Sequence, residues 1–334
     1  MMVDSHIPKV VFCKVKDIDD FWLFLKWRTR DYLFRGHEKA EWNLQNSLER
    51  FYDDRWKFLL KKHSWGEKDK SKAERIMRNM GLGKLATLQE EYYALDSYKH
   101  HAQLENKSMI ATAAILQHYG GKTRLLDVTS SIFIALFFAF ENCNTEKRAI
   151  WAFSESMLYT TCGITDTLLP DGLSEEQRES MAEDLAADNY ELLNNHFLRN
   201  KMCLEYAEKC FSCSENNYGL KNHQGIIPIR VDGNNSRLTA QNGAFLFPKT
   251  LYPFESNLIA ALGCDNENIL RDGEKVFDSV AEYNKSKIRG VPVVKLIFPE
   301  DFYDAAQQIL QQANISARSI YPDEIGLAKS IRYW

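Results

Sequence analysis

The chain is 334 residues long, with 45% hydrophobic and 26% charged residues, so it can bury a sizeable core as one large domain or two ordinary ones. Its net charge of −4 and pI near 6.1 exclude the general basic field with which nucleic-acid-binding proteins hold phosphates, although a local basic patch is still compatible with these values. Seven irregularly spaced cysteines, and an N-terminus without a basic region followed by an apolar run, indicate a reduced cytoplasmic protein.

The first part of the chain alternates predicted helices with short strands. Hydrophobic spacing and β-prone runs predict helices over 17–30, 109–119 and 132–140, and strands over 32–34 and 123–128. The strand over 32–34 is expected to stop in a polar turn at Arg35-Gly36. The helix over 132–140, with Ser130 or Ser131 as its cap, is apolar on every side and should be the most buried helix. It is also too short to cross a bilayer.

The second part of the chain predicts more strands around a different kind of segment. Strands are expected over 149–153, 225–231, 243–247 and 293–298, and an amphipathic helix over 301–312. Residues 154–222 are acidic and helical, with a capping-box spacing at Ser174 and Gln177, and we interpret them as a helical insertion within a single domain over 1–334. Since strands and helices follow no regular βαβ rhythm, the predicted fold class is α+β, with a mixed, mostly antiparallel sheet core flanked by helices.

Four segments resemble the FRG family, which takes its name from a (F/Y)RG motif and is found in bacteria and phages. They comprise Leu33-Phe34-Arg35-Gly36-His37, Leu116 to Thr129 running into Ala135 to Ala139, Gln241 to Phe245, and Ile320 to Ala328. The second segment, LQHYGGKTRLLDVT, is the most specific of the four. The resemblance extends over nearly the whole chain.

A more distant resemblance is to the ADP-ribosyltransferases. An Arg-Gly strand, a Thr-Ser segment leading into an Ala-Leu-x-Phe-Ala helix, and a third strand follow in the same order here at Arg35, Thr129-Ser130 and Gln241 to Phe247. The resemblance implies that Arg35 binds the pyrophosphate or ribose of NAD, because its planar fork makes bidentate hydrogen bonds. It implies that Thr129 or Ser130 supports the nicotinamide and ribose.

The third element departs from the transferase pattern. The positions of the acidic pair hold Gln241 and Gly243, and a glutamine cannot offset the positive charge that develops as nicotinamide leaves. The scaffold would then bind the dinucleotide without turning it over, or use another carboxylate such as Asp127. The candidate catalytic residues are Arg35, Asp127 and Gln241, and the candidate NAD-binding residues are Arg35, Gly36, His118, Arg124, Thr129 and Ser130.

Each candidate also has a structural interpretation. Arg35 could pair with a core carboxylate, His118 could be a satisfied histidine at a helix end, and Thr129 could cap a helix. Arg124 and Asp127 lie three apart on a predicted strand and should point to opposite faces, so each needs its own partner or a ligand.

The sequence therefore favours a nucleotide-binding FRG protein, with NAD as a substrate if it is an enzyme, and a non-catalytic ligand- or partner-binding module as the alternative. A nucleic-acid-acting protein is the second rival, which the acidity opposes. No membrane partner is indicated, and no macromolecular target can be named. Cys210 and Cys213 have the gap of a zinc knuckle, but no second ligand pair has matching spacing, and no metal is expected.

Overall fold

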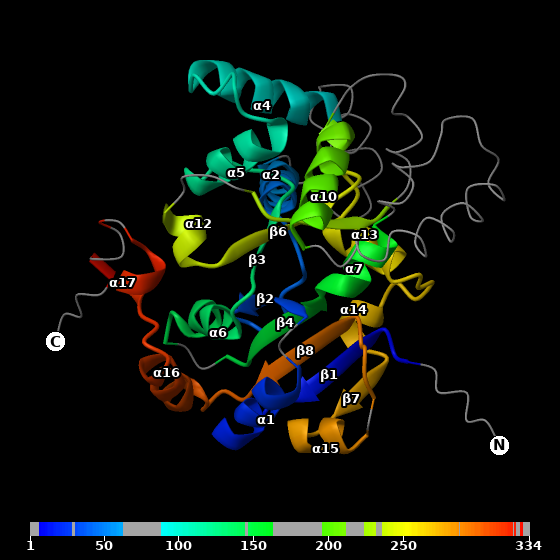
Figure 1. Cartoon of the computed structure of the whole chain (residues 1–334), viewed down its shortest axis with the longest axis vertical. Helices are drawn as coiled ribbons and strands as arrows, with labels where there is room; N and C mark the ends of the chain where they lie inside the picture. The colour runs from blue at the N-terminus through cyan, green and yellow to red at the C-terminus, as the bar shows by residue number, and fades with distance from the viewer. Residues whose placement is uncertain are drawn as a thin grey trace.

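One mixed β-sheet forms the centre of the molecule, with helices on both faces (Figure 1). The computed structural model describes residues 7–28, 31–62, 88–143, 146–162, 196–211, 224–231, 236–286, 288–322, 324 and 328–329. The strand order over these residues is β5-β6-β3-β2-β4-β8-β1-β7. Neighbouring strands are antiparallel except where β1 pairs in parallel with β8 and β7. The predicted α+β class with a mostly antiparallel sheet is confirmed.

The elements follow the predicted order, with several additions. The strands are β1 (Val10–Lys14), β2 (Tyr32–His37), β3 (Leu126–Thr129), β4 (Arg148–Ser154), β5 (Ile226–Ile229), β6 (Gly243–Pro248), β7 (Lys275–Phe277) and β8 (Val293–Phe298). The described helices are α1 (Ile18–Arg28), α2 (Ser47–Lys62), α4 (Leu88–His101), α5 (Met109–His118), α6 (Ile132–Phe140), α7 (Glu155–Thr161), α10 (His196–Phe211), α12 (Ser236–Ala240), α13 (Phe254–Ala261), α14 (Ile269–Asp272), α15 (Val280–Lys285), α16 (Tyr303–Gln312) and α17 (Ala317–Ile320). The sequence did not predict β1, β7, α2, α17 or the short helices α12 to α15.

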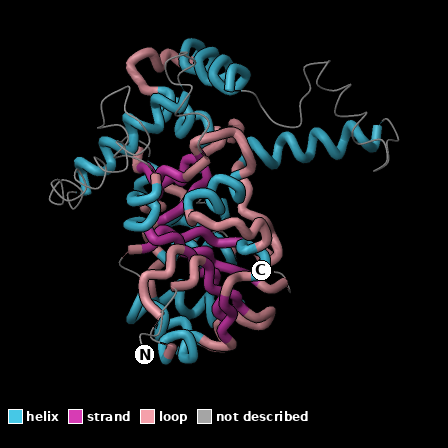
Figure 2. The backbone as a smooth tube through the Cα atoms, turned by 90° about the vertical axis from the view of Figure 1, so that its right-hand side faces the viewer, coloured by secondary structure: helices cyan, strands magenta, loops and turns pink. Residues whose placement is uncertain are grey.

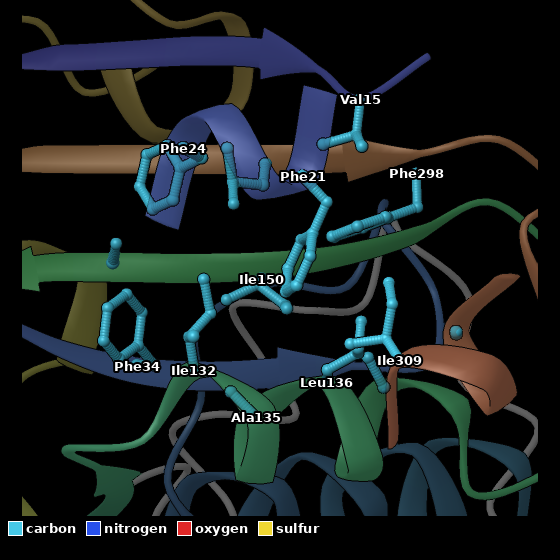
Figure 3. Packing of buried hydrophobic residues seen from close by; sticks show 14 of the residues in the cluster. Val15, Phe21, Phe24, Phe34, Ile132, Ala135, Leu136, Ile150, Phe298 and Ile309 are labelled. Atoms are coloured by element: carbon cyan, nitrogen blue, oxygen red, sulfur yellow. The ribbon is translucent and has the colours of Figure 1, made fainter. Parts of the chain in front are cut away.

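Helix α6 packs into the largest apolar cluster, between the sheet and α16. Ile132, Ala135 and Leu136 face the strands, opposite Ile150 of β4 (Figure 3). Ser131 caps the helix by accepting a hydrogen bond from the Ile134 backbone N–H at 3.4 Å. Burial of nearly every residue of α6 agrees with its apolar sequence.

Strand β2 does not stop at Arg35-Gly36, so the predicted polar turn is wrong. The strand continues to His37, with Arg35 opposite Trp151 and Gly36 opposite Ile150 of β4. The glycine is required for another reason: a Cβ at position 36 would lie 2.0 Å from the backbone oxygen of Ala135 in α6. Gly36 therefore lets α6 lie directly against the sheet.

Two further apolar clusters complete the core. On the face opposite α6, helices α13 and α14 cover side chains such as Leu33 and Trp151. At the β5–β6 end, α5, α7 and α10 cover Ile227 and Phe245. In Figure 2 the strands run through the middle of the molecule with helices packed along them. In the part of the chain that the structure describes, no helix combines the length and apolarity needed to cross a bilayer.

Of the proposed insertion over 154–222, residues 154–162 and 196–211 are described. They form α7 and α10, whose Tyr159 and Tyr206 pack in the same apolar cluster as β5 and β6. The predicted capping box at Ser174 and Gln177 lies outside the described residues. The single-domain assignment over 1–334 stays a prediction.

Candidate functional site

A cleft opens where β2 and β3 separate. A single register pair, Phe34 with Thr129, joins the two strands in the ladder. Past it, the Arg35 side chain spans the gap, and its Nη1 donates a hydrogen bond to the backbone oxygen of Asp127 at 2.8 Å. The cavity has a volume of about 310 Å³. It is lined by Phe34, Arg35, Gly36, Ala114, Gln117, His118, Asp127, Val128, Thr129, Phe138, Arg237, Leu238, Gln241 and Phe245.

Arg35 is held by two neutral acceptors. Besides the Asp127 backbone oxygen, its Nε donates to Nε2 of His37 at 3.2 Å. Burial, reinforced by the charges of Arg35 and Lys295, holds the pKa of His37 well below its usual value, so the ring accepts this bond as a neutral imidazole. Burial lowers the pKa of Arg35 to about 10, which leaves the guanidinium charged at neutral pH. Its remaining N–H groups are available to a ligand.

Asp127 brings a carboxylate to the cleft beside Arg35. Its Oδ1 accepts a hydrogen bond from Nε2 of Gln117 at 2.7 Å, and the hydroxyl of Thr123 donates in turn to Oε1 of Gln117. Water can reach Asp127 from the cleft, yet enough protein surrounds it that desolvation raises its pKa, partly offset by the charge of Arg35. Asp127 is the single carboxylate among the described residues that line the cleft.

Thr129 and Gln241 meet at the far wall of the cleft. The Thr129 hydroxyl donates to the backbone oxygen of Gln241 at 2.7 Å and accepts from the Ser131 backbone N–H at 3.0 Å. Nε2 of Gln241 donates to the backbone oxygen of Ile320 at 3.4 Å. Both residues line the cavity, whereas Ser130 is exposed and does not.

Arg124 lies away from the cleft, contrary to its assignment as an NAD-binding residue. It precedes β3, so it does not alternate with Asp127 on one strand as predicted. Its Nε donates to both carboxylate oxygens of Glu91 at 2.9 Å, and its guanidinium lies 4.7 Å and 4.8 Å from the ring centroids of Phe211 and Phe247. A ligand in the cleft therefore cannot use this arginine without breaking a buried ion pair.

The structure thus brings together most of the predicted site residues, namely Arg35, Gly36, His118, Asp127, Thr129 and Gln241. It adds Gln117, which precedes His118 in the most specific segment, and Arg237. The four-residue spacing of Arg237 and Gln241 on a helical turn was a usable signal, since such residues share a face. The apolar wall residues gave no comparable signal.

The cleft combines two guanidinium groups, one carboxylate and several aromatic rings. Arg35 and Arg237 can make bidentate hydrogen bonds to phosphate, and Asp127 can accept a hydroxyl proton. Apolar walls with a few convergent polar groups are typical of small-molecule sites. Over the described ranges, no three His, Cys, Asp or Glu side chains lie close enough together to hold a metal ion. Cys213 of the zinc-knuckle pair is outside these ranges.

A model of the FRG domain family matches residues 30–148. This region runs from β2 to the start of β4 and supplies the Arg35 and Asp127 walls of the cleft. Arg237 and Gln241 come from beyond it. No curated protein and no solved structure gives a significant match to the chain.

Proposed function

Since the chain is an FRG-domain protein, matched over residues 30–148, we propose that the cleft between β2 and β3 binds a nucleotide, with NAD as the leading candidate. One observation carries the proposal. Arg35, Thr129 and Gln241 are far apart in sequence but line a single cavity. They come from β2, from β3 and from the turn before β6, and these three strands are neighbours in the sheet. This is the arrangement that the resemblance to ADP-ribosyltransferases implies.

The chemistry of Arg35 supports an anionic ligand. The half-buried guanidinium of Arg35 donates to a backbone oxygen and a neutral imidazole, and neither of these acceptors carries a negative charge. Burying such a group is costly unless an anion binds to it. A pyrophosphate supplies that anion and matches the bidentate geometry of the fork.

The chemistry of catalysis centres on Asp127. If nicotinamide leaves, the ribosyl carbon develops positive charge, and a carboxylate stabilises that charge better than the amide of Gln241. Asp127 lines the same cavity as Arg35 and is oriented by Gln117. We therefore assign Asp127 as the residue on which ADP-ribosyl transfer or NAD cleavage would depend.

The test is a calorimetric titration of NAD into the purified protein, combined with a chromatographic assay of nicotinamide release. NAD should bind wild type, and Arg35→Ala should abolish binding. Asp127→Asn should keep binding but reduce nicotinamide release by about 10²–10³-fold. Absence of binding by NAD, ADP and AMP to wild type would reject the proposal.

A non-catalytic binding module is the second candidate, and the Gln241 position favours it. There the transferase pattern has an acidic residue, and here the amide donates to the backbone oxygen of Ile320. This candidate predicts that wild type binds NAD without releasing nicotinamide. It also predicts that Asp127→Asn leaves that behaviour unchanged.

A further inference from the structure

The short segment formed by α17 and Tyr321 contacts the cleft, although it lies far beyond residues 30–148. Tyr321 is buried, and the guanidinium carbon of Arg237 lies 4.6 Å from the centroid of its ring. The same arginine is hydrogen-bonded to the Tyr321 hydroxyl. That hydroxyl donates to both carboxylate oxygens of Glu141 at 3.0 Å. Tyr321 thus connects the end of α6 to Arg237 on the cleft wall.

The direction of these hydrogen bonds is fixed by the groups involved. Burial, together with the charge of Glu141, raises the pKa of Tyr321, so the phenol keeps its proton and donates it to the carboxylate. Arg237 has donors alone, so in its hydrogen bond with Tyr321 the guanidinium donates and the phenol oxygen accepts. Arg237 is therefore oriented by both the ring and the oxygen of Tyr321.

Arg237 needs such support because its own element offers little. Helix α12 has only the five residues Ser236–Ala240, and none of them is buried. A long side chain on such a turn loses rotamer freedom when it binds an anion, and prior ordering by Tyr321 reduces that loss. The segment also accepts a hydrogen bond from Gln241 at the backbone oxygen of Ile320, so it contacts two residues that line the cleft.

We propose that Tyr321 positions Arg237 to bind a second phosphate group, so that the cleft selects nucleotides with a diphosphate over those with one phosphate. The proposal rests on nucleotide binding by the cleft. Arg35 and Arg237 supply two guanidinium groups, and Asp127 supplies one carboxylate. Arg35 comes from β2 and Arg237 from α12, which precedes β6, and β3 lies between these two strands, so a diphosphate can present one phosphate to each guanidinium.

The experiment compares the affinities of adenosine, AMP and ADP for wild type and variants by calorimetric titration. Wild type should bind ADP about 10- to 100-fold more tightly than AMP. Arg237→Gln should remove most of that ratio and leave AMP affinity nearly unchanged. Tyr321→Phe keeps the ring and loses the oxygen, so it should lower the ratio in part, and Tyr321→Leu should lower it further.

Lys329→Gln is the matched control. Lys329 contacts the same Tyr321 ring at 4.4 Å and bonds to Glu141 at 2.5 Å, but it does not line this cleft. It should therefore keep the wild-type ratio of ADP to AMP affinity. Because the ratio compares two ligands on one variant, a general loss of stability does not change it.

The titrations distinguish a failure of nucleotide binding by the cleft from a failure of the role assigned to Arg237 and Tyr321. If wild type binds none of the three probes, both proposals are rejected. If Arg35→Ala abolishes ADP binding while Arg237→Gln and Tyr321→Phe keep the wild-type ratio, the cleft binds nucleotides and the role of Arg237 and Tyr321 is rejected. If Lys329→Gln lowers the ratio of ADP to AMP affinity as much as Arg237→Gln does, the role of Arg237 and Tyr321 is also rejected, because the effect would then come from the loss of a positive charge alone.

Discussion

Arg124 is a buried arginine and Arg35 a half-buried one, both in FRG-like segments, and their surroundings are opposite. Arg124 is 1% exposed, bonded to the carboxylate of Glu91 and enclosed by Phe211 and Phe247. Among the residues that the structure describes, Arg35 donates to the Asp127 backbone oxygen and the His37 ring, and it lines a cavity. An arginine with a buried carboxylate partner holds the fold together, whereas one with neutral acceptors at a cavity wall is available to an anionic ligand.

The largest effect is expected at Arg124. Arg124→Met keeps much of the volume but strands the Glu91 carboxylate in the interior, so the free energy of unfolding should fall by about 3–5 kcal/mol. Urea denaturation measures this loss. Lys122→Met, at an exposed position two residues earlier, should change stability by no more than about 0.5 kcal/mol. A loss of similar size in both variants would remove the structural role assigned to Arg124.

Gly36→Ala should have the next largest effect, because the added Cβ would meet the Ala135 backbone of α6. Overpacking of this kind costs about 1–3 kcal/mol, and the thermal midpoint should fall accordingly. Gly263→Ala is the control, since its φ of +62° is strained for alanine but nothing lies within 4 Å of a Cβ there. It should cost about 1 kcal/mol. A smaller loss at Gly36 than at Gly263 would contradict the close approach of α6.

Asp127→Asn should stabilise the protein slightly, in a pH-dependent way. Because burial raises the pKa of Asp127 in the native state, that state binds more protons than the unfolded chain between the ordinary value of 3.8 and the raised value. Wild-type stability therefore falls as pH rises through this window, and the amide removes that fall. The gain at pH 7 should be below about 1 kcal/mol, since water in the cleft screens the charge. Denaturation at pH 3 and pH 7 measures this gain. The same change in the free energy of unfolding at both pH values would contradict the raised pKa of Asp127.

The sequence predicted the parts of the fold that depend on local pattern. Apolar residues on all sides of 132–140 indicated a buried helix, and short β-prone runs located β4, β5, β6 and β8. The resemblance to ADP-ribosyltransferases assigned Arg35, Thr129 and Gln241 to one site, and these residues line one cavity because β2, β3 and β6 are neighbours in the sheet.

The errors arose where a distant partner decides the outcome. Arg35-Gly36 has the composition of a turn, but pairing with β4 keeps it extended, and α6 explains the glycine. Nothing near Arg124 indicates that Glu91, 33 residues earlier, will neutralise it. Likewise Tyr321 is 84 residues from Arg237, so no local sequence pattern predicts their contact.

The most direct test is the melting of wild type and Arg35→Ala, with and without NAD. In the absence of NAD, Arg35→Ala should change the free energy of unfolding by about 1 kcal/mol or less, because its hydrogen-bond acceptors are neutral and water in the cleft screens its attraction to Asp127. NAD at 100 times its dissociation constant should stabilise wild type by about 2.7 kcal/mol and should not stabilise the variant. A loss of about 3–5 kcal/mol in the variant without NAD, with no effect of NAD on wild type, would make Arg35 a structural arginine like Arg124 and contradict the assignment of the cleft.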